Sequence, residues 1–81
     1  MGYPMLFGER LRSYRKQRQL SQQELAYRIN VNPSLISMFE TGYEGRVPSR
    51  TTAQALAEAL ELPLTEAVDF VLAAIMTHAS A

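Results

Sequence analysis

The chain has 81 residues, of which 47% are hydrophobic and 20% are charged, and its formal net charge at pH 7 is zero. This length fits one small domain, and the absence of cysteine excludes a disulfide framework and a cysteine-ligated zinc site. No signal peptide or membrane span is expected, because no basic region precedes a long apolar stretch and the longest apolar run, 70–76, is too short to cross a bilayer. We therefore expect a soluble, cytoplasmic protein.

The charges are distributed unevenly along the chain. Residues 1–50 contain all eight Lys and Arg together with four Glu, a net charge of +4, whereas residues 51–81 contain four acids and no base, a net charge of −4. Such polarity can turn one face of a molecule toward a polyanion. Taken alone it is equally consistent with an uneven solvated surface, so its weight depends on what the basic half contains.

The first predicted helix lies near the amino terminus. Phe7, Leu11 and Tyr14 stand at helical spacing, which predicts a helix over about residues 7–17 with this face in the core. The preceding apolar segment, 1–6, is interrupted by a proline and either frays or packs on the body of the domain.

A capping box predicts the start of the second helix. Ser21 is followed three residues later by Glu24, so a helix is expected over about residues 22–29. Its inward face contains Leu25, Ala26 and Ile29. Asn30 then tolerates the left-handed backbone that is needed to leave the helix.

A second start signal follows at once. Asn32 is an N-cap residue and Pro33 suits the first helical position, which predicts a helix over about residues 33–41 that ends at Gly42. Ile36 and Phe39 face inward. The residues left facing outward are Ser34, Leu35, Ser37, Met38 and Thr41. Two short helices joined by a tight corner form a helix-turn-helix. Ser and Thr are poor helix formers, so their position on the outer face favours a role in contacting a ligand.

The remaining third of the chain predicts two further helices. Residues 42–49 form a loop, and Ser49 caps a helix that runs to about residue 60. Its buried stripe contains Leu56, Ala57 and Leu60. After the break at Leu62-Pro63, Thr65 is expected to cap a last helix over about residues 66–77.

The last predicted helix has two apolar faces. One contains Val68, Val71, Leu72 and Ile75, and the other contains Ala67, Phe70 and Ala74. One face suffices to dock on the domain, so the surplus favours a dimer contact within residues 64–77, although the amino-terminal segment covering it is an alternative. The residues expected at this contact are Ala67, Phe70, Val71 and Ala74.

The order and spacing of several residues resemble the Cro/cI-like (XRE) family of DNA-binding transcriptional regulators. The matching pieces are Leu20-Ser21-Gln22, Glu24-Leu25-Ala26, Val31, the run from Ser34 through Ile36 and Ser37, and Glu40 with Gly42. The resemblance covers about residues 7–62, with a loop before the fourth helix that is about two or three residues longer than usual. It implies an all-α fold, a compact five-helix bundle of the lambda-repressor-like type, and a dimeric regulator, most simply a repressor, that binds double-stranded DNA at a two-fold symmetric operator without a cofactor.

The resemblance also assigns roles to residues. The helix over residues 33–41 would lie in the major groove, with base-reading candidates Asn32, Ser34, Leu35, Ser37 and Met38. The phosphate-binding candidates are Arg15, Ser21, Gln22, Thr41, Arg46 and Arg50. Because hydroxyls and apolar groups discriminate bases poorly, we expect modest direct readout, with more specificity from DNA shape and dimer spacing. Leu35 is also able to fold back into the core.

The resemblance pairs Arg15 with Glu40. In related repressors the counterparts of these residues form a partly buried ion pair that ties the first helix to the third. The alternative is two independent surface charges that contribute little to stability.

Chemistry for catalysis is missing from the sequence. There is one histidine, His78, in a tail expected to be solvated, and there are no paired carboxylates and no glycine-rich phosphate loop, so we expect neither an enzyme nor a metal site. The open alternatives are a protein-binding module such as an antitoxin that uses its last helix, the DNA-reading part of a longer protein, and a helical hairpin without a ligand.

Overall fold

Five α-helices and one 3₁₀ turn account for most of the structure, a computed structural model that describes residues 7–80 and the side chains of residues 7–77. The elements are α1 (Phe7–Gln17), α2 (Gln22–Ile29), α3 (Pro33–Thr41), the 3₁₀ turn η1 (Tyr43–Gly45), α4 (Arg50–Ala59) and α5 (Leu64–Ser80). Within these residues there is no strand, so the predicted all-α, five-helix fold is confirmed. The expectations for residues 1–6 and for the side chain of His78 fall outside the described residues.

The helix ends follow the local signals of the sequence. The Ser21 hydroxyl oxygen accepts the N–H of Glu24 at 3.0 Å, and the Glu24 carboxylate accepts the N–H of Ser21 at 2.8 Å, which completes the predicted capping box. Asn30 leaves α2 in the left-handed conformation with φ 59°, and Gly42 ends α3 with φ 69°. Asn32 caps α3 by accepting the N–H of Ser34 at 3.0 Å.

The start of α5 differs from the prediction. The helix begins at Leu64, because the carbonyl of Pro63 accepts the N–H of Ala67 at 2.8 Å and so opens the first turn. Thr65 therefore lies inside the helix and is not its cap. The helix also runs three residues beyond the expected end, to Ser80.

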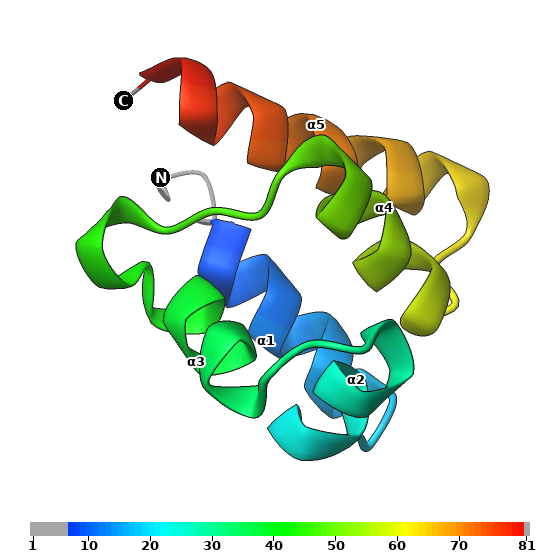
Figure 1. Ribbon diagram of the computed structural model, residues 1–81. Coiled ribbons are helices and arrows are strands. Elements are labelled where there is room, and N and C mark those ends of the chain that lie inside the picture. Colours follow the sequence, from blue (N-terminus) through cyan, green and yellow to red (C-terminus); the bar gives the residue numbers. More distant parts are fainter. Residues whose placement is uncertain (1–6, 81) are drawn as a thin grey trace, which may run out of the picture.

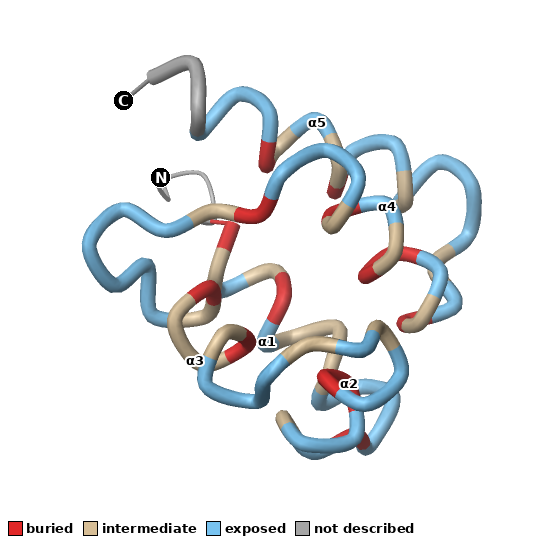
Figure 2. Tube along the Cα trace, in the orientation of Figure 1, coloured by how far each residue is buried: buried red, intermediate tan, exposed pale blue. Residues whose placement is uncertain are grey.

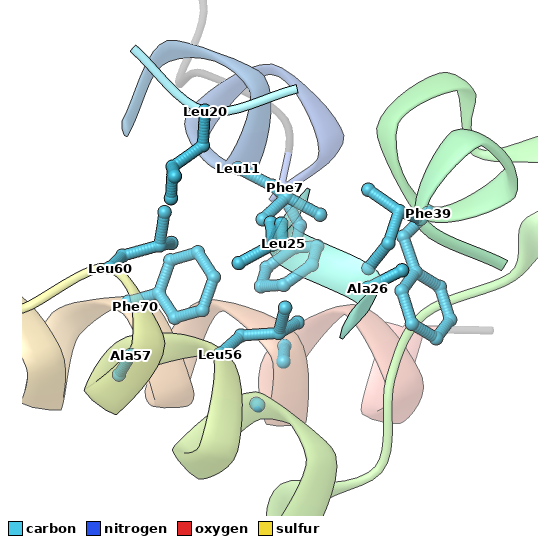
Figure 3. Packing of buried hydrophobic residues seen from close by; sticks show 13 residues of the cluster. Phe7, Leu11, Leu20, Leu25, Ala26, Phe39, Leu56, Ala57, Leu60 and Phe70 are labelled. Carbon is cyan, nitrogen blue, oxygen red and sulfur yellow. The ribbon is translucent and has the colours of Figure 1, made fainter. Parts of the chain in front are cut away.

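The core lies where α1, α4 and α5 meet the helix pair α2 and α3, and Figure 3 shows its side chains converging from all five helices. It contains Phe7, Leu11, Leu20, Leu25, Ala26, Ile36, Phe39, Ala53, Leu56, Ala57, Leu60, Phe70 and Ala74. The ring of Phe70 packs against Phe7, with 4.8 Å between ring centroids, and against the edge of Tyr14 at 5.9 Å. These contacts fix how α5 docks on α1.

This packing corrects the expected dimer contact. Phe70 and Ala74 are fully buried in the chain's own core, so assigning them to a partner was wrong, and Ala67 and Val71 are half-buried against the same core. The two apolar faces of α5 are reversed relative to the prediction, because the face that contains the large aromatic ring is the one that fills the domain. The face left in solvent contains Leu64, Val68, Leu72 and Ile75.

The helices are arranged with α1 near the centre. It packs on α3 and on α5, while α2 packs on α3 and α4. Figure 1 shows α2 and α3 at one end of the molecule and α5 at the other, and Figure 2 shows that the outer sides of all these helices are exposed. An apolar α5 surface and the helix-turn-helix are therefore presented on different sides.

A close approach between α1 and α3 depends on Gly8. A methyl group built on Gly8 would lie 2.6 Å from the carbonyl oxygen of Phe39 and would also overlap the carbonyl of Glu40. Glycine is an unfavourable helix residue, so its presence in the first turn of α1 reflects this contact with the end of α3.

None of the helices described in residues 7–80 is long and apolar enough to span a membrane.

Candidate nucleic-acid interface

The exposed edge of α3 is narrower than the sequence predicted. Asn32 and Ser34 are exposed at its start, and Ser37 and Met38 are half-buried farther along. Leu35 packs against the hydrophobic core, so its side chain follows the alternative expectation of folding back toward the domain. The groups that remain accessible for base contacts are an amide, hydroxyls and the outer part of one thioether side chain.

Capping determines what the first residues of α3 can offer. The Oδ1 atom of Asn32 accepts both the N–H of Ser34 at 3.0 Å and the hydroxyl of Ser34 at 2.8 Å. The Asn32 side-chain amide keeps its two N–H donors, and the Ser34 oxygen keeps its acceptor capacity. This end of α3 can therefore donate to acceptors such as guanine O6 and accept from the amino groups of adenine or cytosine.

A partly buried ion pair connects α1 to α3 behind this edge. Nε of Arg15 lies 2.6 Å from one carboxylate oxygen of Glu40, and Nη2 of Arg15 donates to the other at 3.1 Å. The two side chains are only 11% and 4% exposed, which confirms the predicted partly buried pair. The hydrogen bond to Glu40 raises the pKa of Arg15, while burial acts in the opposite direction, so the guanidinium remains charged.

The ion pair extends to α2. Nε2 of Gln22 donates to Glu40 at 3.1 Å, and the remaining bond of Arg15 goes to the carbonyl of Leu20 at 2.8 Å. One carboxylate thus joins α1, α2 and α3, and the sequence did not reveal the Gln22 contact. The consequence is that the amino terminus of α2 is tied to α3 by a hydrogen bond.

Several predicted phosphate-binding groups already have partners inside the chain. The N–H of Ser21, expected to face phosphate, donates to Glu24, so that assignment needs correction. The side-chain amide of Gln22 bonds Glu40, and the hydroxyl of Thr41 donates to the carbonyl of Ser37 at 3.1 Å. For Gln22 the groups that remain for an anion are the second N–H of the side-chain amide and the backbone N–H in the first turn of α2, where helix N–H groups have no intrahelical acceptor.

Arg46 and Arg50 are exposed cations in the segment that follows α3. Neither side chain makes a hydrogen bond or ion pair with another of the described residues, so both guanidinium groups are available to an external anion. Arg46 follows η1, and Arg50 is the first residue of α4.

Two other arginines hold the carboxyl end of α4. Arg18 donates to the carbonyls of Leu60 and Glu61, both at 2.8 Å, and Arg28 donates to the carbonyl of Ala59 at 3.3 Å. Cations at a helix carboxyl end satisfy its free carbonyls and oppose its dipole. Much of the positive charge of the first half therefore stabilises the fold.

Comparison with known proteins agrees with this arrangement. Residues 11–66 match the family described as helix-turn-helix. The HTH-type transcriptional repressor RghR of Bacillus subtilis (strain 168) is 44% identical over 57 residues, which is 70% of this chain and 42% of that protein. The comparison with solved structures gives no match.

The chain belongs to the helix-turn-helix family of DNA-binding regulators. It spans about two fifths of the length of the curated relative that it matches.

Within residues 7–77, no group of three or more His, Cys, Asp or Glu side chains is placed to hold a metal ion.

Proposed function

We propose that this protein is a repressor that acts in the cytoplasm and binds a two-fold symmetric DNA operator with α3 in the major groove. The observation that carries the proposal is the connection of α2 and α3 through Glu40, which holds the exposed edge of α3 beside the first-turn N–H groups of α2. Such a helix pair has the geometry needed to place side chains on base edges while a helix terminus meets a phosphate.

Selection of bound sequences from a random DNA pool, followed by fluorescence anisotropy on the selected duplex, tests this proposal. Ser34→Ala is expected to weaken binding about 2- to 12-fold at the selected site, because a single neutral hydrogen bond contributes about 0.5–1.5 kcal/mol, and to relax the preference at one base position. Arg50→Gln is expected to weaken selected and unrelated duplexes equally, as a phosphate contact does. A selection that yields no enriched sequence, with no salt-sensitive binding to any duplex, would end the proposal.

The exposed face of α5 supports a second part of the proposal, a homodimer. Leu64 is 80% exposed, and Val68, Leu72 and Ile75 extend the same stripe along the helix. These residues recur every three or four positions, so a second copy of α5 could cover them. A monomer at every concentration on a duplex carrying both half-sites would refute this part.

The same stripe supports the alternative of a protein-binding module. An apolar helix face of four side chains also suits a partner helix from another protein. Sedimentation of the protein alone and with operator DNA separates the two, because a homodimer needs no third component.

A further inference from the structure

A hollow of about 350 Å³ lies between α1 and α5, two helices that pack on each other (Figure 1). Its lining consists of Arg10, Ser13, Tyr14 and Gln17 from α1 and Glu66 from α5. Tyr14 also meets the edge of Phe70, so the hollow borders the contact that docks α5 on α1. The volume is at the small end of the range for ligand pockets, and no residue of α2 or α3 contributes to the lining.

Arg10 has a hydrogen-bond donor that the fold does not use. Its side chain is half-buried, and its Nε atom is fully covered and has no hydrogen-bond partner. Among the side-chain nitrogen and oxygen atoms of the described residues, this is the one that is buried without a bond. Buried N–H groups nearly always have a partner, because leaving one without an acceptor lowers stability. An acceptor supplied from outside the chain would satisfy this donor.

The opposite wall of the hollow has an unpaired negative charge. Glu66 lies in the first turn of α5 and is exposed. Its carboxylate makes no ion pair or hydrogen bond with Arg10 or with another described residue. One small hollow is therefore lined by a cation from α1 and an anion from α5 that do not neutralise each other, which suits a ligand with both charges.

The α1 wall also provides neutral groups beside Arg10. Nε2 of Gln17 donates to the hydroxyl oxygen of Ser13 at 3.4 Å, which leaves the hydroxyl hydrogen of Ser13 free to donate. The half-buried ring of Tyr14 adds an apolar surface. A carboxylate is thus favoured at the α1 wall, an ammonium at the α5 wall, and carbon atoms between them against the aromatic ring.

We propose that this hollow binds a small zwitterion of the α-amino acid class, with its carboxylate at Arg10 and its ammonium at Glu66. Nε and one Nη of a guanidinium lie on the same edge and hold a carboxylate with two parallel hydrogen bonds. Because Nε is covered, binding requires the long Arg10 side chain to turn toward the hollow, where the new bond satisfies the unused donor. A simple anion gains only the Arg10 side, since Glu66 repels it.

Two-dimensional NMR of the ¹⁵N-labelled chain tests the site, with each of the common amino acids added singly up to about 10 mM. At least one is expected to shift the amide resonances of Ser13, Tyr14 and Glu66 with a dissociation constant of about 0.1–1 mM, as suits a ligand of about ten heavy atoms. Acetate and methylammonium, which carry one charge each, are expected to bind at least about tenfold more weakly.

Charge removal identifies the two walls. Arg10→Met and Glu66→Gln are each expected to weaken binding of that amino acid at least about tenfold, since hydrogen bonds to charged groups are the stronger ones. The matched controls are Arg12→Met on α1 and Glu58→Gln on α4, which change exposed charges outside the hollow and should bind like the parent. Glu66→Gln alters an exposed side chain, so its thermal midpoint is expected to match the parent and loss of folding cannot imitate loss of binding.

Three outcomes would refute this site. The first is that no amino acid shifts these resonances at about 10 mM. The second is that acetate binds as tightly as the best amino acid and Glu66→Gln has no effect, which would make the hollow a site for simple anions. The third is that Arg10→Met, Glu66→Gln and the double variant all lower the thermal midpoint of the ligand-free protein by the same amount, more than about 4 °C, because the two charges would then pair directly. None of these measurements contains DNA, so their results are independent of the proposed function.

Discussion

Removal of the Glu40 carboxylate should be the most damaging single change behind the DNA-binding edge. Glu40 accepts two hydrogen bonds from Arg15 and one from Gln22, at 2.6, 3.1 and 3.1 Å. In Glu40→Ala, Arg15 retains the carbonyl of Leu20 and loses its counter-charge at a position only 11% exposed. Breaking a fully buried pair costs about 3–5 kcal/mol, and the partial burial of this pair together with the retained carbonyl places the expected loss at the low end, about 3 kcal/mol.

This loss is large for a domain of 81 residues, whose total stability is expected to be about 4–12 kcal/mol. The thermal midpoint should fall by about 12–24 °C. Urea unfolding followed by circular dichroism measures the change, and Glu58→Ala, which removes an exposed acid on α4, serves as the matched control with an expected change within about 0.5 kcal/mol.

A double-mutant cycle isolates the pair from other effects of truncation. The cycle uses Arg15→Met, Glu40→Met and the variant with both changes, and the double variant should recover much of the stability that Glu40→Met loses because no charge is left buried without its partner. The reasoning is refuted if Glu40→Ala unfolds within 0.5 kcal/mol of the parent, or if the double variant is destabilised by the full sum of the two single variants.

Three further outcomes are expected from single changes. Gly8→Ala should cost about 1–3 kcal/mol in urea unfolding, because the new methyl overlaps the end of α3; an unchanged midpoint would show that the helices separate freely. Hydrogen bonds from the backbone and hydroxyl of Ser21 lower the pKa of Glu24, so its stabilisation is present at neutral pH and is lost as the pH falls below about 4.5 through the lowered value. Glu24→Gln should therefore reduce the urea midpoint at pH 7, and its difference from the parent should shrink as the pH falls through that range. Leu72→Glu should abolish binding of a second copy to a two-half-site duplex, with single half-site affinity and thermal midpoint unchanged, and a retained second copy would exclude the exposed stripe of α5.

The helix boundaries were predictable because their causes are local. Ser21 with Glu24, and Asn32 with Pro33, specify helix starts within four residues of sequence, and the structure places the starts of α2 and α3 at the same positions. The cap of α5 was not predictable in the same way. Thr65 is a good capping residue, but Pro63 supplies the first carbonyl of the helix two residues earlier.

The faces of α5 were assigned wrongly because both are apolar at helical spacing. Which face is buried depends on shape complementarity with α1, where Phe7 and Tyr14 receive the ring of Phe70. No periodicity within α5 contains that information. The same limit applies to Ser21 and Gln22, whose polar groups look available in the sequence and are used by neighbours that are three and eighteen residues away.

The distribution of arginine contacts changes what the charge polarity means for DNA binding. Arg15, Arg18 and Arg28 are committed to Glu40 and to the carboxyl end of α4, so they stabilise the fold rather than neutralise phosphate. The exposed cations without a partner among the described residues include Arg12 and Lys16 on α1 and Arg46 and Arg50 after α3, which predicts a slope of log K against log salt of about −1.8 for one copy on a half-site if the last two meet phosphate and about −3.6 if all four do. This small number of charges gives weak electrostatic affinity, so specific binding needs the second copy and the helix amino terminus. A measured slope steeper than about −4 on a single half-site would mean that the arginines at α4 release their carbonyls to reach DNA.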